Sequence, residues 1–221
     1  GLIGELYQGE ITDSYSEGLV RSDRYYVGGL IGYSHYRYVP TVKWYHCGSS
    51  GNETICYDNE PDGSPIYYIK NSHFKGDVHG VSYVGGLIGF DTLSISPVEE
   101  NPKTVAKINR IILKSYSEGN VDGKSNLGGL VGTSVYGSKA KYEVFDQMDS
   151  CYHVGGNIGA SKDAYSSYRG GIAGKTYYNI FNSYSKGNVL GYQFLGGLAG
   201  FIHNANSSVN KTIKNSYSEG N

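Results

Sequence analysis

Polar and apolar positions alternate with a period of two in a short phrase that returns along the chain. Residues 11–16 read Ile-Thr-Asp-Ser-Tyr-Ser, and the same order of apolar, Asx and tyrosine positions returns at 180–184 and 213–217. Such alternation is typical of a half-buried strand. We expect the isoleucine and tyrosine side chains to point inward and the serines outward. The opposite register, with the serines inward, stays open because a slip of one residue exchanges the two faces.

Stacked copies of this strand would place equivalent side chains in columns. The tyrosines of the phrase would then form one column, which consists of Tyr15, Tyr116, Tyr184 and Tyr217. We expect His73 to break this column in the second copy and Cys151 to break it in the fourth.

A second phrase, Gly-Gly-Leu-apolar-Gly, keeps two adjacent positions apolar. Its copies lie at 28–32, 85–89, 128–132, 170–174 and 196–200, and a shortened copy opens the chain at 1–4. Adjacent side chains of a strand point to opposite faces, so this strand is buried on both sides or lies at a corner where glycines let neighbouring backbones approach. Because interior glycine weakens an ordinary strand, its return in every copy also suggests a conformational need such as a positive φ.

The spacing of the two phrases predicts stacked units with one constant and one variable arm. The return from Gly174 to Asn182 takes eight residues, whereas that from Gly32 to Asn71 takes thirty-nine. This self-similarity predicts an all-β fold, a β-solenoid (β-helix-like) built from about six Gly-rich repeats, with loop insertions on one edge. We expect a single repeat array over 1–221, with a disulfide-bearing insertion at 33–68. The repeat cores are expected near 1–20, 28–32 with 69–78, 85–89 with 112–121, 128–132 with 149–158, 170–174 with 180–189, and 196–200 with 213–221.

Gly-Gly-Leu-Ile-Gly together with Asn-Ser-Tyr-Ser-x-Gly-Asn-Val resembles the GLUG repeat, which is named for its Gly-Leu-apolar-Gly core. The similarity covers the constant arms along the whole chain but not the insertions. Repeats of this family occur in large secreted or surface-attached microbial proteins, among them adhesins, surface-layer-like proteins and non-catalytic regions of some immunoglobulin A peptidases. The resemblance implies a β-solenoid in an extracellular setting, and it brings no catalytic or binding residues because the motif itself is structural. The insertion at 33–68 and the irregular fourth copy depart from the family pattern.

Composition and charge narrow the classes of function. The formal net charge of −1 gives no electrostatic support for binding nucleic acid. No run of about 18 apolar residues is present, so we expect no membrane insertion in this segment. The 33 glycines and 23 tyrosines suit turn-dense β structure outside the cell. Tyrosines in and beside the variable arms either provide contact area for a protein or a glycan, or pack the insertions onto the solenoid.

Two cysteines flank a polar loop in the longest insertion. A disulfide between Cys47 and Cys56 would close this loop and stabilise the insertion by about 2–3 kcal/mol. The alternatives are two free thiols or a metal site with His46, although three ligands without a fourth make a poor zinc site. Cys151 is either a buried, inert thiol or a cysteine that bonds to another molecule.

Few other residues suggest chemistry. Asn52, Asn206 and Asn210 begin Asn-x-Ser/Thr sequons in variable arms and are candidate N-glycosylation sites. Residues 58–63 vaguely resemble a calcium loop, but Ile69 stands where a bidentate Glu is needed, so we expect a solvated turn and no metal site. The six histidines and the mixed Asx positions form no catalytic constellation, so we expect neither enzyme activity nor a cofactor.

These observations predict an extracellular structural protein of a microbial surface that assembles with copies of itself into a filament, sheath or surface layer. Both ends of the sequence fall inside a unit, which predicts a segment of a longer chain or polymer, and open solenoid ends recruit further strands. An adhesin stalk or display module that binds a host protein or a glycan is the alternative. A non-catalytic accessory region of a secreted hydrolase is a third hypothesis.

Overall fold

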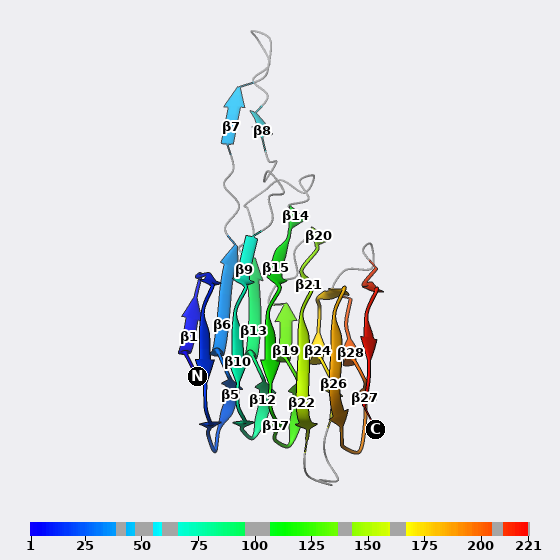
Figure 1. Cartoon of the computed structure of the whole chain (residues 1–221). Coiled ribbons are helices and arrows are strands. Elements are labelled where there is room, and N and C mark those ends of the chain that lie inside the picture. Colours follow the sequence, from blue (N-terminus) through cyan, green and yellow to red (C-terminus); the bar gives the residue numbers. More distant parts are fainter. Residues whose placement is uncertain are drawn as a thin grey trace.

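The computed structural model is all-β over the residues that it describes, which are 1–38, 43–46, 55–58, 66–95, 107–136, 143–159, 167–204 and 210–220. Short strands follow one another around a turn of the solenoid, here called a coil, and each coil stacks on the next (Figure 1). The strands of successive coils pair in parallel and nearly always in register. The predicted β-solenoid is confirmed.

Five columns of parallel strands run along the solenoid axis. Column I contains β1 (Ile3–Tyr7), β6 (Ile31–Tyr38), β13 (Ile88–Ile95), β19 (Val131–Tyr136), β24 (Ala173–Thr176) and β28 (Ala199–Ile202). Column II contains β2 (Ile11–Thr12), β9 (Ile66–Lys70), β15 (Arg110–Leu113), β21 (Gln147–Asp149), β25 (Asn179–Phe181) and β29 (Ile213–Lys214). Column III contains β3 (Tyr15–Glu17), β10 (His73–Lys75), β16 (Tyr116–Glu118), β22 (Tyr152–Ile158), β26 (Tyr184–Val189) and β30 (Tyr217–Ser218). Column IV contains β4 (Val20–Arg21), β11 (Val78–His79), β17 (Val121–Asp122) and the C-terminal ends of β22 and β26. Column V contains β5 (Tyr25–Gly28), β12 (Ser82–Gly85), β18 (Ser125–Gly128), β23 (Arg169–Gly170) and β27 (Leu195–Gly196).

The alternation of the sequence phrase breaks at a corner between columns II and III. Asp13 has a φ of +48°, and the equivalent corner residues of the other coils share this left-handed backbone. Because the corner resets the alternation, Ile11 points inward on column II, whereas Tyr15 points outward on column III and is 62% exposed. On the inward side, Ser115 and Ser117 are buried. The expected inward tyrosines are therefore wrong, and the serine-inward register holds on column III.

Asx side chains at this corner bond from coil to coil. Asn71 Nδ2 donates to Asp13 Oδ1 over 2.9 Å, and Asn182 Nδ2 donates over 2.9 Å to Oδ1 of Asp149, which precedes the corner residue Ser150 of its coil. Asn215 continues the second row by donating to Asn182 Oδ1 over 3.1 Å. Asn and Asp tolerate the left-handed backbone of the corner better than most residues do. The same residue types therefore suit both the turn and the hydrogen bonds between coils.

Lys114 occupies this corner in the third coil with a φ of 47°. Lys114→Asn is expected to raise the free energy of unfolding by about 0.5–1.5 kcal/mol, because asparagine suits the left-handed backbone and its amide can donate to Asn71. Urea denaturation measures the change. The control Lys124→Asn, at an exposed position, should alter stability by less than about 0.5 kcal/mol. If the Lys114 variant were no more stable than the wild type, asparagine at this corner would not stabilise the solenoid as described.

The Gly-Gly-Leu corner between columns V and I is a point of close backbone approach. Gly86 has an ordinary φ, and a Cβ built on it would lie 2.1 Å from the carbonyl oxygen of Gly129 and 2.4 Å from Ser117 Oγ. The suggested positive φ is therefore wrong for this phrase. Positive φ occurs instead at glycines that follow the Ser-Tyr-Ser phrase, such as Gly76 (φ +136°) and Gly119 (φ +124°). The alternative explanation, a corner where neighbouring backbones approach, is confirmed.

Apolar side chains of the columns fill the interior. In the first five coils the inward row of column II consists of Ile11, Ile69, Ile112, Met148 and Ile180, all buried. Both apolar side chains of the glycine phrase are also buried, as at Leu87 and Ile88, because the chain turns between the two residues. Each coil therefore buries its apolar side chains by stacking on its neighbours.

The variable arms between columns I and II leave from one edge, the upper one in Figure 1. The longest arm contains β7 (Lys43–His46) and β8 (Ile55–Asp58), which form an antiparallel hairpin. The next two arms contain β14 (Lys107–Ile108) and β20 (Glu143–Val144), which pair in parallel. The connection from β22 to β23 begins and ends at the opposite edge.

Candidate functional site

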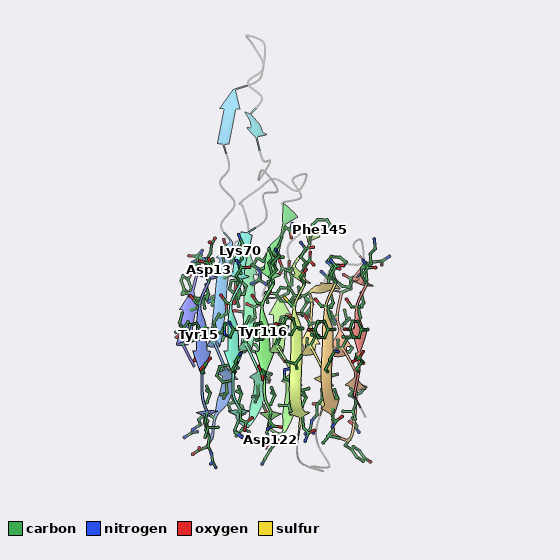
Figure 2. All side chains as sticks on the ribbon, viewed as in Figure 1. Asp13, Tyr15, Lys70, Tyr116, Asp122 and Phe145 are labelled. Atoms are coloured by element: carbon green, nitrogen blue, oxygen red, sulfur yellow. The ribbon has the colours of Figure 1, made fainter. Side chains whose placement is uncertain are left out.

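An aromatic ladder runs along the outer face of column III, on which Figure 2 labels Tyr15 and Tyr116. Its rings are Tyr15, His73, Tyr116, Tyr152, Tyr184 and Tyr217, one from each coil. Successive ring centroids are 5.2, 4.6, 4.7, 5.0 and 5.2 Å apart, and the interplanar angles are 7°, 3°, 6°, 3° and 8°. His73 thus continues the ladder. In the fourth coil the ladder residue is Tyr152, because Cys151 lies one residue before it, next to the corner. Both expected breaks are therefore wrong.

The ladder follows from the in-register parallel pairing of column III, since strands repeat every ~4.8 Å and place equivalent side chains above one another. Inside the ladder each ring face contacts the next ring, and the residues Tyr116, Tyr152 and Tyr184 are partly exposed. Exposed charges follow the same strands: Lys75 Nζ lies 3.8 Å from Glu118 Oε2, and Lys186 Nζ lies 3.1 Å from Glu219 Oε2. Such exposed pairs add little to stability.

Behind the ladder, column III carries an inward row that packs against the Gly-Gly corner. The row consists of Ser16, Phe74, Ser117, His153, Ser185 and Ser218. His153 is fully buried, and its Nδ1 lies 2.9 Å from Ser117 Oγ. Burial lowers the pKa of His153 to about 4, so its ring is neutral in the folded protein near neutral pH.

His153 should make stability depend on acidity. Its folded pKa of about 4 lies below the ordinary 6.5, so protonation favours the unfolded chain. The contribution of the neutral His153 ring to the free energy of unfolding is constant above pH 6.5. It is lost as pH falls from 6.5 toward 4, by up to about 1.4 kcal/mol per pH unit. His153→Phe places in this row the residue that Phe74 provides in the second coil. We expect the variant to lose less stability than the wild type over this interval, as measured by urea denaturation at several pH values; identical pH profiles would contradict the assignment.

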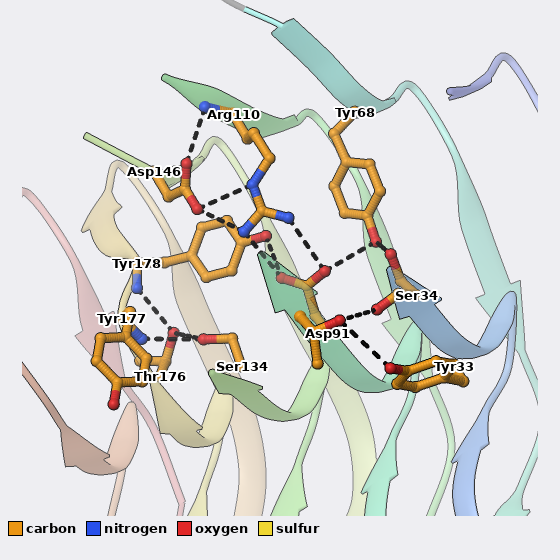
Figure 3. A network of polar contacts seen from close by, with 11 residues as sticks. Tyr33, Ser34, Tyr68, Asp91, Arg110, Ser134, Asp146, Thr176, Tyr177 and Tyr178 are labelled. Atoms are coloured by element: carbon orange, nitrogen blue, oxygen red, sulfur yellow. Dashed lines mark hydrogen bonds and ion pairs between the residues drawn. The ribbon is translucent and has the colours of Figure 1, made fainter. Parts of the chain in front are cut away.

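A buried ion network joins columns I and II near the variable arms (Figure 3). Arg110 donates to Asp146 Oδ2 through Nε at 2.9 Å and through Nη2 at 2.5 Å. Its Nη1 and Nη2 donate to the two carboxylate oxygens of Asp91 at 3.2 and 3.1 Å. The hydroxyls of Tyr68 and Tyr178 donate to Asp91 at 3.2 and 2.8 Å. These five residues are at most 1% exposed, so the network is sealed from solvent.

The electrostatics of the network favour permanent pairing. Burial alone would lower the pKa of Arg110, but the Asp146 and Asp91 carboxylates outweigh it and hold that pKa well above its ordinary value. Burial raises the pKa of the Tyr68 and Tyr178 phenols well above the ordinary value, so both remain donors. The network ties coils together and offers no group to an external substrate.

Cys151 lies on the inward side of the column II–III corner, where other coils have serines such as Ser115 and Ser183. Its thiol donates to the carbonyl oxygens of Ile112 and Asp149, each over 3.3 Å. Burial raises the pKa of this thiol to about 12, and the side chain is free and fully buried. The position corresponds to the buried, inert alternative, since a bond to another molecule would require the corner to open.

A second aromatic surface follows column V. Its residues have left-handed backbone although they are aromatic: Tyr26 (φ 63°), Tyr83 (φ 59°), Tyr168 (φ 52°) and Phe194 (φ 51°). The third coil has Asn126 at this position, with a φ of 55°. Asparagine is the residue type that this backbone favours, so aromatic side chains here are a conformationally costly choice. They contact aromatic rings of column I, with 4.8 Å between the centroids of Tyr26 and Phe90 and 5.1 Å between those of Tyr168 and Phe201.

The remaining expected site residues are dispersed. Asn210 is exposed, whereas Asn52, Asn206 and Cys47 lie outside the described residues, and the side chain of Cys56 on β8 does too. Within the described ranges, no group of three or more His, Cys, Asp or Glu side chains is placed to hold a metal ion. The same ranges contain no helix that is long and apolar enough to cross a membrane.

Sequence reasoning missed the ion network. Its signals were an arginine within an apolar strand, at Arg110, and an aspartate at Asp91 where the equivalent residues of neighbouring coils are Ser34 and Ser134. The two signals are far apart in the sequence, and only the coil register brings them together.

Comparisons with known proteins add no relative. A scan against protein-family models gives no match, and searches of curated proteins and of solved structures also give none.

Proposed function

We propose that this chain is an extracellular structural protein of a microbial surface, whose solenoid stacks end to end on further copies to build a filament, sheath or layer. The distribution of exposed apolar side chains supports this proposal. Among the side chains that the structure describes, every exposed large hydrophobic one lies in the first coil or C-terminal to Val189, where columns IV and V end and the last coil begins. They are Leu2, Tyr7, Tyr15, Leu19, Tyr25, Tyr26, Leu190, Tyr192, Phe194, Leu195, Ile213 and Tyr217.

The strands of the two end coils leave open edges in columns I to III. At one end, β1, β2 and β3 each pair with a single neighbour, and at the other end β28, β29 and β30 do the same. Such unpaired edges recruit further strands. Columns I to III contain six strands while columns IV and V contain five, so β28, β29 and β30 form a raised step that would meet β1, β2 and β3 of the next copy. In that arrangement the ring of Tyr217 would stack on Tyr15 and continue the aromatic ladder.

Sedimentation velocity over a range of concentrations tests this proposal. The wild-type chain is expected to form larger species as its concentration rises. Leu19→Lys and Ile213→Lys place a charge on either end and should weaken association about tenfold or more, which corresponds to about 1.4 kcal/mol. The control Lys124→Glu changes an exposed side chain of a middle coil and should leave association unchanged. A wild-type chain that stays monomeric, or end variants that associate as it does, would reject the proposal.

The second candidate, a display module that binds a glycan or a host protein, is favoured by the left-handed aromatic residues of column V. Backbone strain that recurs at one surface position is a reason to look for function there. Tyr83→Asn is the discriminating variant, because Asn126 demonstrates that asparagine fits this backbone. Binding to a glycan array by the wild type and its loss in a fully folded Tyr83→Asn variant would support this candidate, and no binding by the wild type would reject glycan binding.

A further inference from the structure

We propose that the aromatic ladder of column III is a site of oxidative modification, at which tyrosines of neighbouring coils couple to dityrosine. Tyr116, Tyr152, Tyr184 and Tyr217 are consecutive phenols, with ring centroids 4.7, 5.0 and 5.2 Å apart and planes within 8° of parallel. Parallel rings on in-register strands bring equivalent ring carbons to similar separations. Each ortho carbon therefore lies near its counterpart on the next coil.

The coupling is a balanced oxidation. Two phenols each lose one electron and one proton, and the resulting phenoxyl radicals join through ring carbons ortho to the oxygen. The ortho hydrogens then move to the oxygens and restore both phenols. The oxidant is hydrogen peroxide, used by a haem peroxidase, and one peroxide is reduced to two waters for each carbon–carbon bond formed.

The surroundings of the ladder favour one pair over the others. The four tyrosines are partly or largely exposed and so accessible to an oxidant, whereas contact between ring faces holds each radical beside its partner. Lys186 Nζ lies 5.7 Å from the centre of the Tyr184 ring, and a cation at this distance opposes loss of an electron from that ring. Tyr152 lies in the field of the Glu118 carboxylate, which also contributes to its raised pKa after burial and the neighbouring phenols. Tyr116 and Tyr152, which form the closest tyrosine pair of the ladder, should therefore couple first.

Within the ladder, Tyr15 stacks on a histidine and not on a tyrosine, so it can be compared with the four consecutive tyrosines. His73 stacks between Tyr15 and Tyr116, with centroid distances of 5.2 and 4.6 Å. An imidazole cannot supply a phenoxyl radical, and it separates the two tyrosines by two coil spacings. Tyr15 should therefore remain uncoupled within the molecule although it is 62% exposed. Stacking, and not exposure alone, is expected to select the tyrosines that react.

The test treats the dilute chain with a haem peroxidase and hydrogen peroxide, digests it with trypsin and maps cross-linked peptides by tandem mass spectrometry. Cleavage after lysine and arginine places the four consecutive tyrosines in separate peptides, 115–124, 142–162, 176–186 and 215–221. We expect cross-linked peptide pairs whose mass is two hydrogens below the sum of the two peptide masses, and the first such pair should join Tyr116 to Tyr152. Pairs with Tyr184 and Tyr217 should follow.

Tyr152→His is the matched variant, because His73 already occupies a ladder position. It should abolish both pairs that involve residue 152 and leave the pair between Tyr184 and Tyr217. Tyr152→Phe serves the same purpose if the histidine variant does not fold. Tyr192, which is 67% exposed and outside the ladder, is the comparison for random oxidation. Ladder tyrosines that couple no more often than Tyr192, or an unchanged dityrosine yield in the folded variant, would overturn the proposal.

Discussion

Arg110→Met is expected to lower the free energy of unfolding by about 3–5 kcal/mol, because it leaves two carboxylates buried without a counter-charge. Asp91 and Asp146 are at most 1% exposed, so solvent cannot replace the guanidinium. After the substitution, Asp91 would keep only the hydroxyl donors of Tyr68 and Tyr178. Urea denaturation at neutral pH measures the loss.

Two controls separate charge from packing at this site. Arg21→Met removes an exposed arginine of the first coil and should change stability by less than about 0.5 kcal/mol. A triple variant, Arg110→Met with Asp91→Asn and Asp146→Asn, removes all three charges and should recover much of the loss, because neutral replacements of buried ion groups are often tolerated. If Arg110→Met and Arg21→Met had equal effects, the buried network would not stabilise the solenoid.

Gly86→Ala is expected to destabilise the solenoid by more than about 4 kcal/mol or to prevent folding, because a single added methyl group has no room. The new Cβ would lie 2.1 Å from the carbonyl oxygen of Gly129, which belongs to the backbone of the next coil. Backbone contacts of this kind cannot be relieved by a side-chain rotation, so neighbouring coils would have to separate. Circular dichroism and thermal unfolding measure the effect.

Gly4→Ala is the matched control, since a Cβ on Gly4 would meet no atom within 4 Å. It should change stability by less than about 1 kcal/mol, with a slight gain from the reduced freedom of the unfolded chain. A Gly86 variant as stable as the Gly4 variant would mean that the coils do not approach each other at the glycine corner.

The repeat phrases were sufficient to predict the solenoid, because every coil carries the same strand and corner signals. They could not fix which way the tyrosines point. The corner at Asp13 has left-handed backbone and resets the alternation, so Ile11 and Tyr15 end on opposite sides although they are four residues apart. An Asx residue between two alternating segments was the available signal for that corner.

The candidate site was less accessible to sequence reasoning. Cys151 is one residue away from the tyrosine position of its coil. Asp149 resembles the Asx of the phrase although the corner residue is Ser150, which concealed that Tyr152 continues the ladder. The ion network depends on Arg110, Asp91 and Asp146 coming together from three segments. A period of variable length hides such contacts, since insertions change the sequence distance between equivalent positions while the coil spacing stays fixed.

The side faces and ends of this solenoid differ in a way that supports assembly. Along the sides, rings stack on rings and amides bond to amides, whereas the exposed large apolar side chains lie in the first coil and C-terminal to Val189. The most direct test is cryo-electron microscopy of the protein as isolated from its source. The proposal predicts fibres, tubes or sheets in which strands repeat every ~4.8 Å along the solenoid axis and the ladder continues from one copy into the next. Separate particles of uniform, finite length, with no contact between solenoid ends, would contradict it.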